Sequence, residues 1–460
     1  MHTKNNTFLS TDERHDLFEF IRRTMYWAAM YPLHLESWAP QRFQKFGQFI
    51  ELIYELILYL VCIHIAILYG CTFYLNYHSG DLELLVNCLM QIIIYLWTFG
   101  MKVYFRRLRS GKLEEVIESL NSRYETRSAR GFTYVTMDKC VAMSNKWIKT
   151  YVYSCFSGAV FWLIVPITYG DRSLPLTCWY PMDYKKPIIY ETIYILQAVA
   201  QIQVAAAFSS SSGLHMVLSI LISGQYDILF CSLKNVFATV AMRMHLTVEQ
   251  LIKLRKHQDD QQPELNEFYC STEKVFAIDK LDLISNQIST TKFHYHFRAT
   301  FKKCIKHHCY ILECLKNMET FFNPIWFLKT GQVILLMCLV AFVSVKSTTA
   351  NSSFMKNLSL GQYLFLVAWE FLVICYFAQI IFINSQQYGE AILRSPWYLY
   401  LSEIKSDMLF FLQRSYRPFK LTAGTVFPLN IDWYRWVIST AFSFLTLLQK
   451  MDQRDGNVSI

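Results

Sequence analysis

The side chains best suited to hold a metal ion lie in one short basic string between residues 304 and 314. Cys304 and His308 are four residues apart and would share one face of a helix, and His307, Cys309 and Cys314 lie close by. A closed metal site would need further ligands from other parts of the chain, and the string has a basic amphipathic pattern. We therefore predict packed cysteines and histidines here, with no metal and no other cofactor.

Charged side chains inside apolar segments are the second group that could do chemistry. Glu370 lies in the middle of a long uncharged stretch, where a carboxylate is costly and usually has a function. Either it acts on a ligand or ion, or it is protonated or hydrogen-bonded to neighbouring helices, because no basic partner is evident at its depth. Asp432 and Arg435 are three residues apart and either pair on one helix face or line water.

Catalytic signatures of soluble enzymes are absent from the sequence. It contains no G-x-G string, no P-loop lysine motif, no HExxH and no GxSxG. The string Asn323 to Phe327 (NPIWF) superficially matches the inner end of a G-protein-coupled receptor helix, but it precedes an apolar segment and predicts a capping turn. The sequence therefore indicates that the protein is not an enzyme.

The composition places these side chains in a membrane protein. Of 460 residues, 53% are hydrophobic, 16% aromatic and only 17% charged, with a mean hydropathy of +0.21. Seven segments are long and apolar enough to cross a bilayer as helices, the fourth being longer than one crossing requires. They are about 52–75, 84–101, 149–168, 188–225, 325–345, 358–384 and 425–448.

Lysines and arginines set the orientation of these spans. The connections on one side of the membrane hold 34 of them and those on the other side hold 7. The N-terminus is therefore predicted in the cytoplasm and the C-terminus outside, and the net charge of +9 needs no nucleic-acid partner. The glycosylation sequons at Asn351, Asn357 and Asn457 fall on the outer side. Cys178, in an outer loop, could pair with Cys71 or Cys88.

Two cytoplasmic stretches, 275–317 and 391–412, carry apolar side chains at helical spacing with nothing in the chain obviously large enough to cover them. Such stripes usually mark subunit contacts, and in the second stretch they include Trp397, Leu401 and Ile404.

Four strings within this inverted seven-helix topology resemble the insect odorant receptor family. They are LPLTCWYP at 174–181, S-x-W-Y at 395–398, LTAGTVFPL at 421–429 and TAFSFLTLL at 440–448. The sister gustatory receptors carry a TY-x5-QF string in the last span, where this chain has Thr440 followed by Ala441 and ends on Leu447 and Leu448. A gustatory-type channel is the alternative; a transporter or a G-protein-coupled receptor fits the span count and charge bias less well.

The resemblance implies an all-helical membrane bundle that assembles with common co-receptor subunits as a heterotetrameric, non-selective cation channel opened by a small volatile. It implies a multi-pass protein of the plasma membrane, in sensory dendrites. The expected divisions are a cytoplasmic segment (1–46), spans one to four with the odorant pocket in their outer half (47–222), a cytoplasmic helical connection (223–324) with a flexible loop near 253–267, spans five and six (325–384), a cytoplasmic anchor helix (385–420), the pore-lining seventh span (421–450) and an outer tail (451–460).

The family's pocket has a glycine followed four positions later by a tryptophan on the third span, which Gly158 and Trp162 match; helix packing around a small residue is the alternative for this pair. The other expected pocket residues are placed by helix face or depth: Ile92, Tyr95, Cys155, Phe161, Gln197, Ala200, Gln201, Phe365, Leu366 and Trp369. Their character implies a small aromatic ligand held by dispersion and ring stacking, with one hydrogen bond from Gln197 or Gln201. The spans themselves are expected to contact membrane lipid.

The seventh span is expected to carry the channel gate. Ser443, Leu447 and Lys450 can share one face at its outer end, where the resemblance places a narrow hydrophobic ring crossed by permeating cations. In the alternative arrangement Leu447 packs on spans five and six while Leu445 or Leu448 faces the pore.

Overall fold

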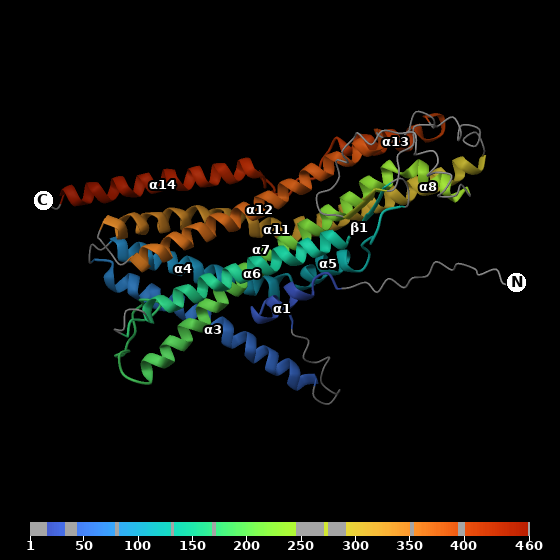
Figure 1. Ribbon diagram of the computed structural model, residues 1–460. Helices are drawn as coiled ribbons and strands as arrows, with labels where there is room; N and C mark the ends of the chain where they lie inside the picture. The colour runs from blue at the N-terminus through green and yellow to red at the C-terminus, as the bar shows by residue number, and fades with distance from the viewer. Residues whose placement is uncertain are drawn as a thin grey trace.

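The computed structural model describes residues 16–32, 44–78, 82–129, 133–167, 172–244, 271–274, 291–349, 354–393 and 401–458. The long helices are α3 (Gln44–Asn76), α4 (Leu82–Val103), α6 (Asp138–Ile167), α7 (Ile189–Lys234), α11 (Thr291–Thr349), α12 (Phe354–Leu393) and α14 (Ile431–Val458) (Figure 1). The shorter elements are α1 (Glu19–Trp27), a π-helical turn (Tyr104–Leu108), α5 (Ser110–Asn121), α8 (Val236–Arg243) and α13 (Leu401–Ser415).

Two small antiparallel sheets complete the described part of the chain. Strand β1 (Thr133–Thr136) pairs with β2 (Ser271–Lys274), and β3 (Thr422–Ala423) pairs with β4 (Phe427–Pro428). The sequence did not predict either sheet. They are short, and the fold is otherwise the expected helical bundle.

Six helices of the described chain, α3, α4, α6, α7, α11 and α12, are long and apolar enough to cross a membrane. The first six predicted spans lie in these helices, in the predicted order. Helix α14 covers the seventh predicted span from residue 431 onward, whereas residues 425–430 of that span form the turn and strand β4 before it. The helix is amphipathic, because one of its faces carries exposed charged and hydroxyl side chains. The protein is therefore a multi-pass, all-α membrane protein.

Helix α7 forms the centre of the bundle. Nearly every side chain from residue 203 to residue 233 is buried, and α6 and α12 pack along it. Its 46 residues would extend about 69 Å at 1.5 Å per residue, more than twice the hydrocarbon thickness. Its second half therefore continues beyond the membrane, as the sequence predicted. The serines at 209–212 are all buried, since small side chains let neighbouring helices approach closely.

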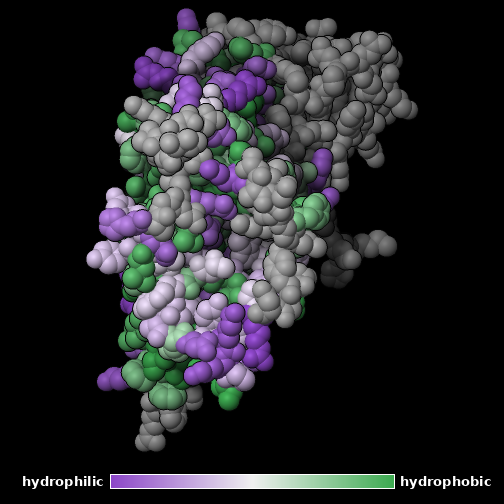
Figure 2. Space-filling view, turned by 90° about the vertical axis from the view of Figure 1, so that its left-hand side faces the viewer, coloured by the Kyte–Doolittle hydropathy of each residue, from purple (hydrophilic) through white to green (hydrophobic). Residues whose placement is uncertain are grey.

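Helices α5, α8 and α13, which belong to the three basic connections, lie at one end of the bundle (Figure 1). The charge bias assigns this end to the cytoplasm. The opposite end faces the viewer in Figure 2, where hydrophilic side chains gather near the top and again lower down, and hydrophobic side chains lie between them along the left side. A polar end beside an apolar flank is the distribution expected where a helical bundle leaves the bilayer.

The cytoplasmic half of α11 packs within the chain, which corrects one expectation. Phe297 and Phe301 are buried, and the ring of Phe301 lies 5.8 Å from that of Phe411 in α13. The ring of Phe293 lies 5.7 Å from that of Phe237 in α8. Helices α8 and α13 thus cover these aromatic side chains of α11 within the same chain. Residues 275–290 of the predicted stripe lie outside the described residues.

Helix α14 lies at the edge of the bundle and contacts α11 and α12 (Figure 1). Val437, Ala441 and Leu445 form its buried face at a spacing of four residues. The opposite face, which includes Ser443 and Leu447, is exposed in the single chain. The helix therefore has one face for its own bundle and one face free for other contacts.

Candidate ligand-binding site

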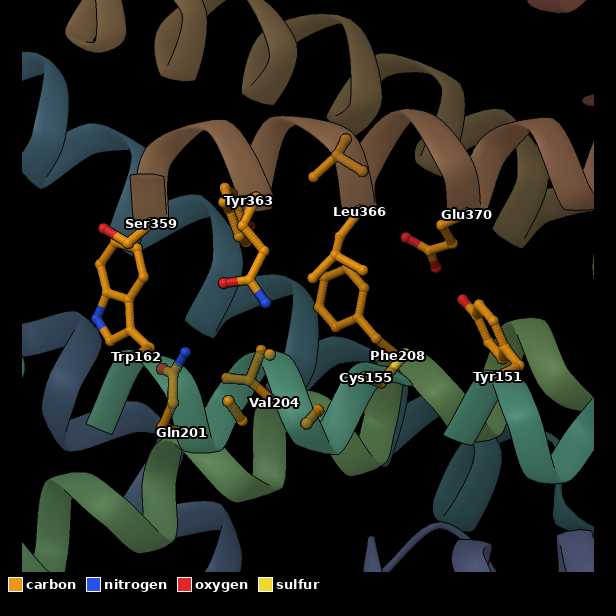
Figure 3. A pocket seen from close by; sticks show the side chains of 15 residues that line it. Tyr151, Cys155, Trp162, Gln201, Val204, Phe208, Ser359, Tyr363, Leu366 and Glu370 are labelled. Carbon is orange, nitrogen blue, oxygen red and sulfur yellow. The ribbon is translucent and has the colours of Figure 1, made fainter. Parts of the chain in front are cut away.

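An internal cavity of about 90 Å³ lies between α6, α7 and α12 (Figure 3). Its wall is mostly aliphatic and aromatic, with a few amide, hydroxyl and carboxyl groups. The lining residues are Tyr151, Cys155, Gly158, Ala159 and Trp162 from α6; Gln201, Val204, Ala205 and Phe208 from α7; and Ser359, Gln362, Tyr363, Leu366, Val367 and Glu370 from α12.

Gly158 lines the cavity at a close contact between α6 and α12. A Cβ atom at this position would lie 3.0 Å from Leu366 Cδ1 and 3.2 Å from Gln362 Nε2. Both distances are shorter than ordinary van der Waals contact, so any side chain here would push the α12 residues. A glycine at residue 158 therefore lets the side chains of Leu366 and Gln362 end directly against α6, at the wall of the cavity.

Two different environments form the ends of the cavity (Figure 3). Trp162 and Ser359 lie at one end, and the Trp162 ring is oriented by donation from Nε1 to the carbonyl of Pro175, 3.3 Å away. Tyr151 and Glu370 lie at the other end. A ligand in the cavity would therefore meet an indole ring at one end and a carboxyl group at the other.

Glu370 is part of a buried ion pair that the sequence did not reveal. Lys329 Nζ of α11 lies 2.7 Å from Glu370 Oε2, and the hydroxyl of Ser212 donates to Oε1 over 2.6 Å. The Lys329 ammonium also lies 4.3 Å from the centre of the Phe208 ring. The expectation that Glu370 has no basic partner at its depth was wrong, because α11 and α12 pack at a register that joins these two spans.

Five of the twelve predicted pocket residues line the cavity, namely Cys155, Gly158, Trp162, Gln201 and Leu366. The other seven do not: Ile92, Tyr95, Phe161, Gln197, Ala200, Phe365 and Trp369.

Hydrogen bonds and exposure explain three of these differences. Tyr95 is buried behind the wall and donates its hydroxyl to Gln201 Oε1 over 2.9 Å. Gln197 exchanges two hydrogen bonds with the backbone of Leu176, at 2.9 and 3.0 Å, so its amide holds the outer loop. Phe365 is 62% exposed on the outside of α12.

Ten lining residues were missed, although helical periodicity could have found them. On α6, positions 151, 155, 158, 159 and 162 follow a spacing of three and four, and so do 359, 362, 363, 366, 367 and 370 on α12. Following the same helix faces from Gly158 and Leu366 would have added Tyr151 and Glu370 to the predicted pocket. Placement by depth instead selected neighbours such as Phe161 and Phe365, which lie on other faces of the same helices.

A second cavity of about 470 Å³ adjoins the outer end of the first. It is lined by residues of α4, α6, α12, the α6–α7 loop and Val343 of α11. Trp162 and Ser359 belong to the walls of both cavities. The two side chains therefore lie where the cavity meets a larger outer space, which we call the vestibule.

The gate residues predicted on α14 are exposed in the single chain. Leu447 is 53% exposed and Ser443 and Lys450 are exposed too, whereas Leu445 is only 9% exposed. Within this subunit, Leu445 packs on the bundle, which differs from the alternative arrangement in which Leu447 packs there. Asp432 and Arg435 lie on the exposed face 3.5 Å apart.

The turn that leads into α14 is bound to α11. Asn323 Nδ2 donates to the carbonyl and the hydroxyl of Thr422, at 2.9 and 2.8 Å, and the amide of Gly424 donates to the Asn323 carbonyl over 3.2 Å. Gly424 has φ +65°, and a Cβ there would lie 2.6 Å from Phe327 Cδ2, so the position requires glycine. The NPIWF string is therefore inside a continuous helix with Pro324 within it, rather than in a capping turn.

The structure describes only some of the predicted anchor residues and glycosylation sites. Trp397 and Asn351 lie outside the described residues, and the side chains of Leu401, Ile404 and Asn457 within α13 and α14 are not described. Asn357 lies in the first turn of α12.

No disulfide joins Cys178 to Cys71 or to Cys88, all three of which lie within the described residues. Burial raises the pKa of the Cys178 thiol to about 11, so this group is a poor nucleophile for disulfide exchange.

The predicted packing of the Cys and His string is visible on α11. The His308 ring lies 4.4 Å from the Tyr388 ring, and His307 Nε2 lies 3.0 Å from Gln225 Oε1. Cys304 is buried and Cys309 is exposed. Within the described residues, no group of three or more His, Cys, Asp or Glu side chains is placed to hold a metal ion.

A membrane-spanning helical bundle with an apolar cavity between its helices is typical of membrane proteins that bind small molecules. Residues 81–442 match the family model described as 7tm Odorant receptor. The chain is 52% identical to Odorant receptor 83a of Drosophila melanogaster, over 98% of this chain and 99% of that one, and 32% identical to Putative odorant receptor 85e of the same species, over 91% and 88%. It belongs to the 7tm odorant receptor family.

Solved structures share the fold. The insect olfactory receptor OR5 from Machilis hrabei superimposes with a TM-score of 0.68 at 15% identity, covering 94% of this chain and 97% of that one. The same receptor in complex with eugenol gives a TM-score of 0.66 over 95% and 98%. At this identity the likeness shows that the helical architecture is common to both proteins.

Proposed function

We propose that this odorant receptor binds a small volatile in the cavity between α6, α7 and α12 and thereby opens a non-selective cation channel. The observation that carries the proposal is the cavity itself, an apolar and aromatic space inside the bundle whose width depends on Gly158. Such a lining suits a ligand held by dispersion and ring stacking with few hydrogen bonds. The eugenol complex of the Machilis hrabei receptor supports an aromatic ligand.

Binding of an aromatic ring would enlarge the cavity. The space is about 90 Å³, whereas an engineered cavity of about 150 Å³ is known to hold benzene. The ligand would therefore displace Leu366 or Gln362, whose side chains end against Gly158, or turn Trp162 toward the vestibule. Displacement of α12 side chains is a direct way for binding to act on α12, which packs against α14.

The pore would be formed by the exposed face of α14 from several subunits around one axis. Leu447 then supplies a hydrophobic ring that excludes water when closed, with Ser443 below it and Lys450 at the outer rim. The bound turn between Asn323 and Gly424 supports this assignment, because it ties α14 to the helix that carries Lys329.

Assembly would use the cytoplasmic end, with common co-receptor subunits completing a heterotetramer. Leu409 and Phe410 of α13 are 54% and 76% exposed, beyond the reach of lipid in the assigned topology. Burying such side chains against another subunit is favourable by about 25 cal/mol per Å². Residues 385–420 would thus form the anchor, with Trp397, Leu401 and Ile404 in its apolar stripe.

Current recording in oocytes tests the whole proposal. The chain is expressed at the plasma membrane with and without the co-receptor, and a panel of small aromatic and aliphatic volatiles is applied. We expect cation currents from some volatiles only when both proteins are present. Surface-expressed protein that stays silent to the whole panel with the co-receptor would contradict the proposal.

A further inference from the structure

The inner end of the cavity is closed by a carboxylate that is already paired. Glu370 lines the cavity, and its two oxygens accept hydrogen bonds from Lys329 and Ser212 at 2.7 and 2.6 Å. All three residues are buried. Figure 3 shows the Glu370 carboxyl group directed into the space opposite Tyr151.

This carboxylate can still accept a hydrogen bond from a ligand. An ionised carboxyl group has about four lone-pair sites, and each of its two oxygens here receives one donor from the protein. The donors come from α11 and α7, whereas Glu370 meets the cavity from α12. A hydroxyl group in the cavity would therefore find a charged acceptor that does not have to give up its existing partners.

The charge pattern selects among possible donors. A ligand ammonium would bring a second cation to a carboxylate that Lys329 already neutralises, and the two cations would repel at short range. A ligand carboxylate would face Glu370 itself and would be repelled. A neutral hydroxyl group avoids both costs and gains a charge-assisted hydrogen bond.

We propose that the ligands of this receptor are neutral alcohols or phenols whose hydroxyl group donates to Glu370. This inference rests on the proposed function, since it takes the same cavity as the odorant site. Lys329 and Ser212 hold the carboxylate in place, and the apolar body of the ligand lies toward Leu366 and Trp162. Ethers and hydrocarbons of the same shape fit the cavity but leave this acceptor unused.

Matched ligands test the inference on the unaltered receptor. The full chain and the co-receptor are co-expressed, and half-maximal concentrations are measured for phenol, 4-methylphenol and benzyl alcohol against toluene, p-xylene and ethylbenzene, in which a methyl group replaces the hydroxyl group. A hydrogen bond to a charged acceptor should lower the half-maximal concentration of each hydroxyl compound at least about tenfold relative to its partner.

A double variant identifies Glu370 as the group responsible. Lys329→Gln with Glu370→Gln removes both charges together, so no buried charge loses its partner. The hydroxyl preference should shrink by at least about threefold, because the new acceptor is neutral. Tyr376→Phe is the control, since it removes a hydroxyl from an exposed position on the same helix.

The outcomes separate this inference from the proposed function. Equal responses to hydroxyl compounds and their partners overturn the inference, as does an unchanged preference in a double variant that reaches the surface. The receptor could also be silent toward every alcohol and phenol but respond to other volatiles, with a response that Gly158→Leu abolishes. This result would overturn the inference about hydroxyl ligands and leave the proposed binding site standing. If the double variant fails to reach the surface, the comparison of matched ligands on the unaltered receptor decides.

Discussion

Gly158→Leu is the perturbation whose effect follows most directly from the cavity's dimensions. Even the first added carbon would lie 3.0 Å from Leu366 Cδ1, so the larger side chain must occupy the space that a ligand would take. Filling a cavity of about 90 Å³ contributes about 2 kcal/mol at roughly 24 cal/mol per Å³. Losing that contribution should raise the half-maximal odorant concentration about thirtyfold. Gly158→Ala should give a smaller shift, since the ends of Leu366 and Gln362 can move.

The assay is a concentration–response curve with the co-receptor, paired with surface labelling, because overpacking can also cost about 1–3 kcal/mol of stability. Gly361→Leu is the matched control: it makes the same substitution on α12, where a Cβ would have no neighbour within 4 Å. The reasoning is refuted if Gly158→Leu leaves the curve unchanged, or if Gly361→Leu shifts it equally at equal surface expression.

Three further perturbations test the pore, its connection to the bundle and the anchor. Leu447→Ser should produce current without odorant or alter permeability ratios, because a polar ring no longer excludes water; currents identical to the parent would place Leu447 outside the pore. Asn323→Ala removes the donor to two Thr422 oxygens, at a cost of about 1–3 kcal/mol, and should lower the maximal current while the half-maximal concentration stays the same; an unchanged maximum would contradict this coupling. Leu401→Lys with Ile404→Lys should abolish co-purification with the co-receptor but not membrane insertion, and undiminished co-purification would refute the anchor.

The helical architecture was readable from the sequence because each span carries its own signal. A segment of about 20 apolar residues must form a helix in hydrocarbon wherever the rest of the chain lies. The length of α7 was readable for the same reason, since its uncharged stretch exceeds one bilayer. The cover of the α11 stripe was not readable, because it depends on how α8, which precedes α11, and α13, which follows two further spans, pack against it.

The pocket was predictable where a helix face could be assigned and unpredictable where only depth was available. Gly158 and Trp162 fixed the phase of α6, and both line the cavity. On α4 no residue fixed the phase, and Tyr95 was placed in the pocket although it lies behind Gln201 and supports it through a hydrogen bond. Depth alone leaves several faces of a helix open, and only the packing of neighbouring helices decides among them.

The ion pair between Glu370 and Lys329 could not be predicted from the sequence either. Each residue alone is a costly charge in an apolar span, and the sequence places them 41 residues apart on two helices. Their separation along the membrane normal depends on helix tilt and on the path of the α11–α12 connection, which the sequence does not specify. Once paired, neither charge can be removed without leaving the other buried and uncompensated, at a cost of about 3–5 kcal/mol. A carboxyl group whose two oxygens are held by Lys329 and Ser212 keeps its position at the end of the cavity, which a hydrogen-bond acceptor for a small ligand requires.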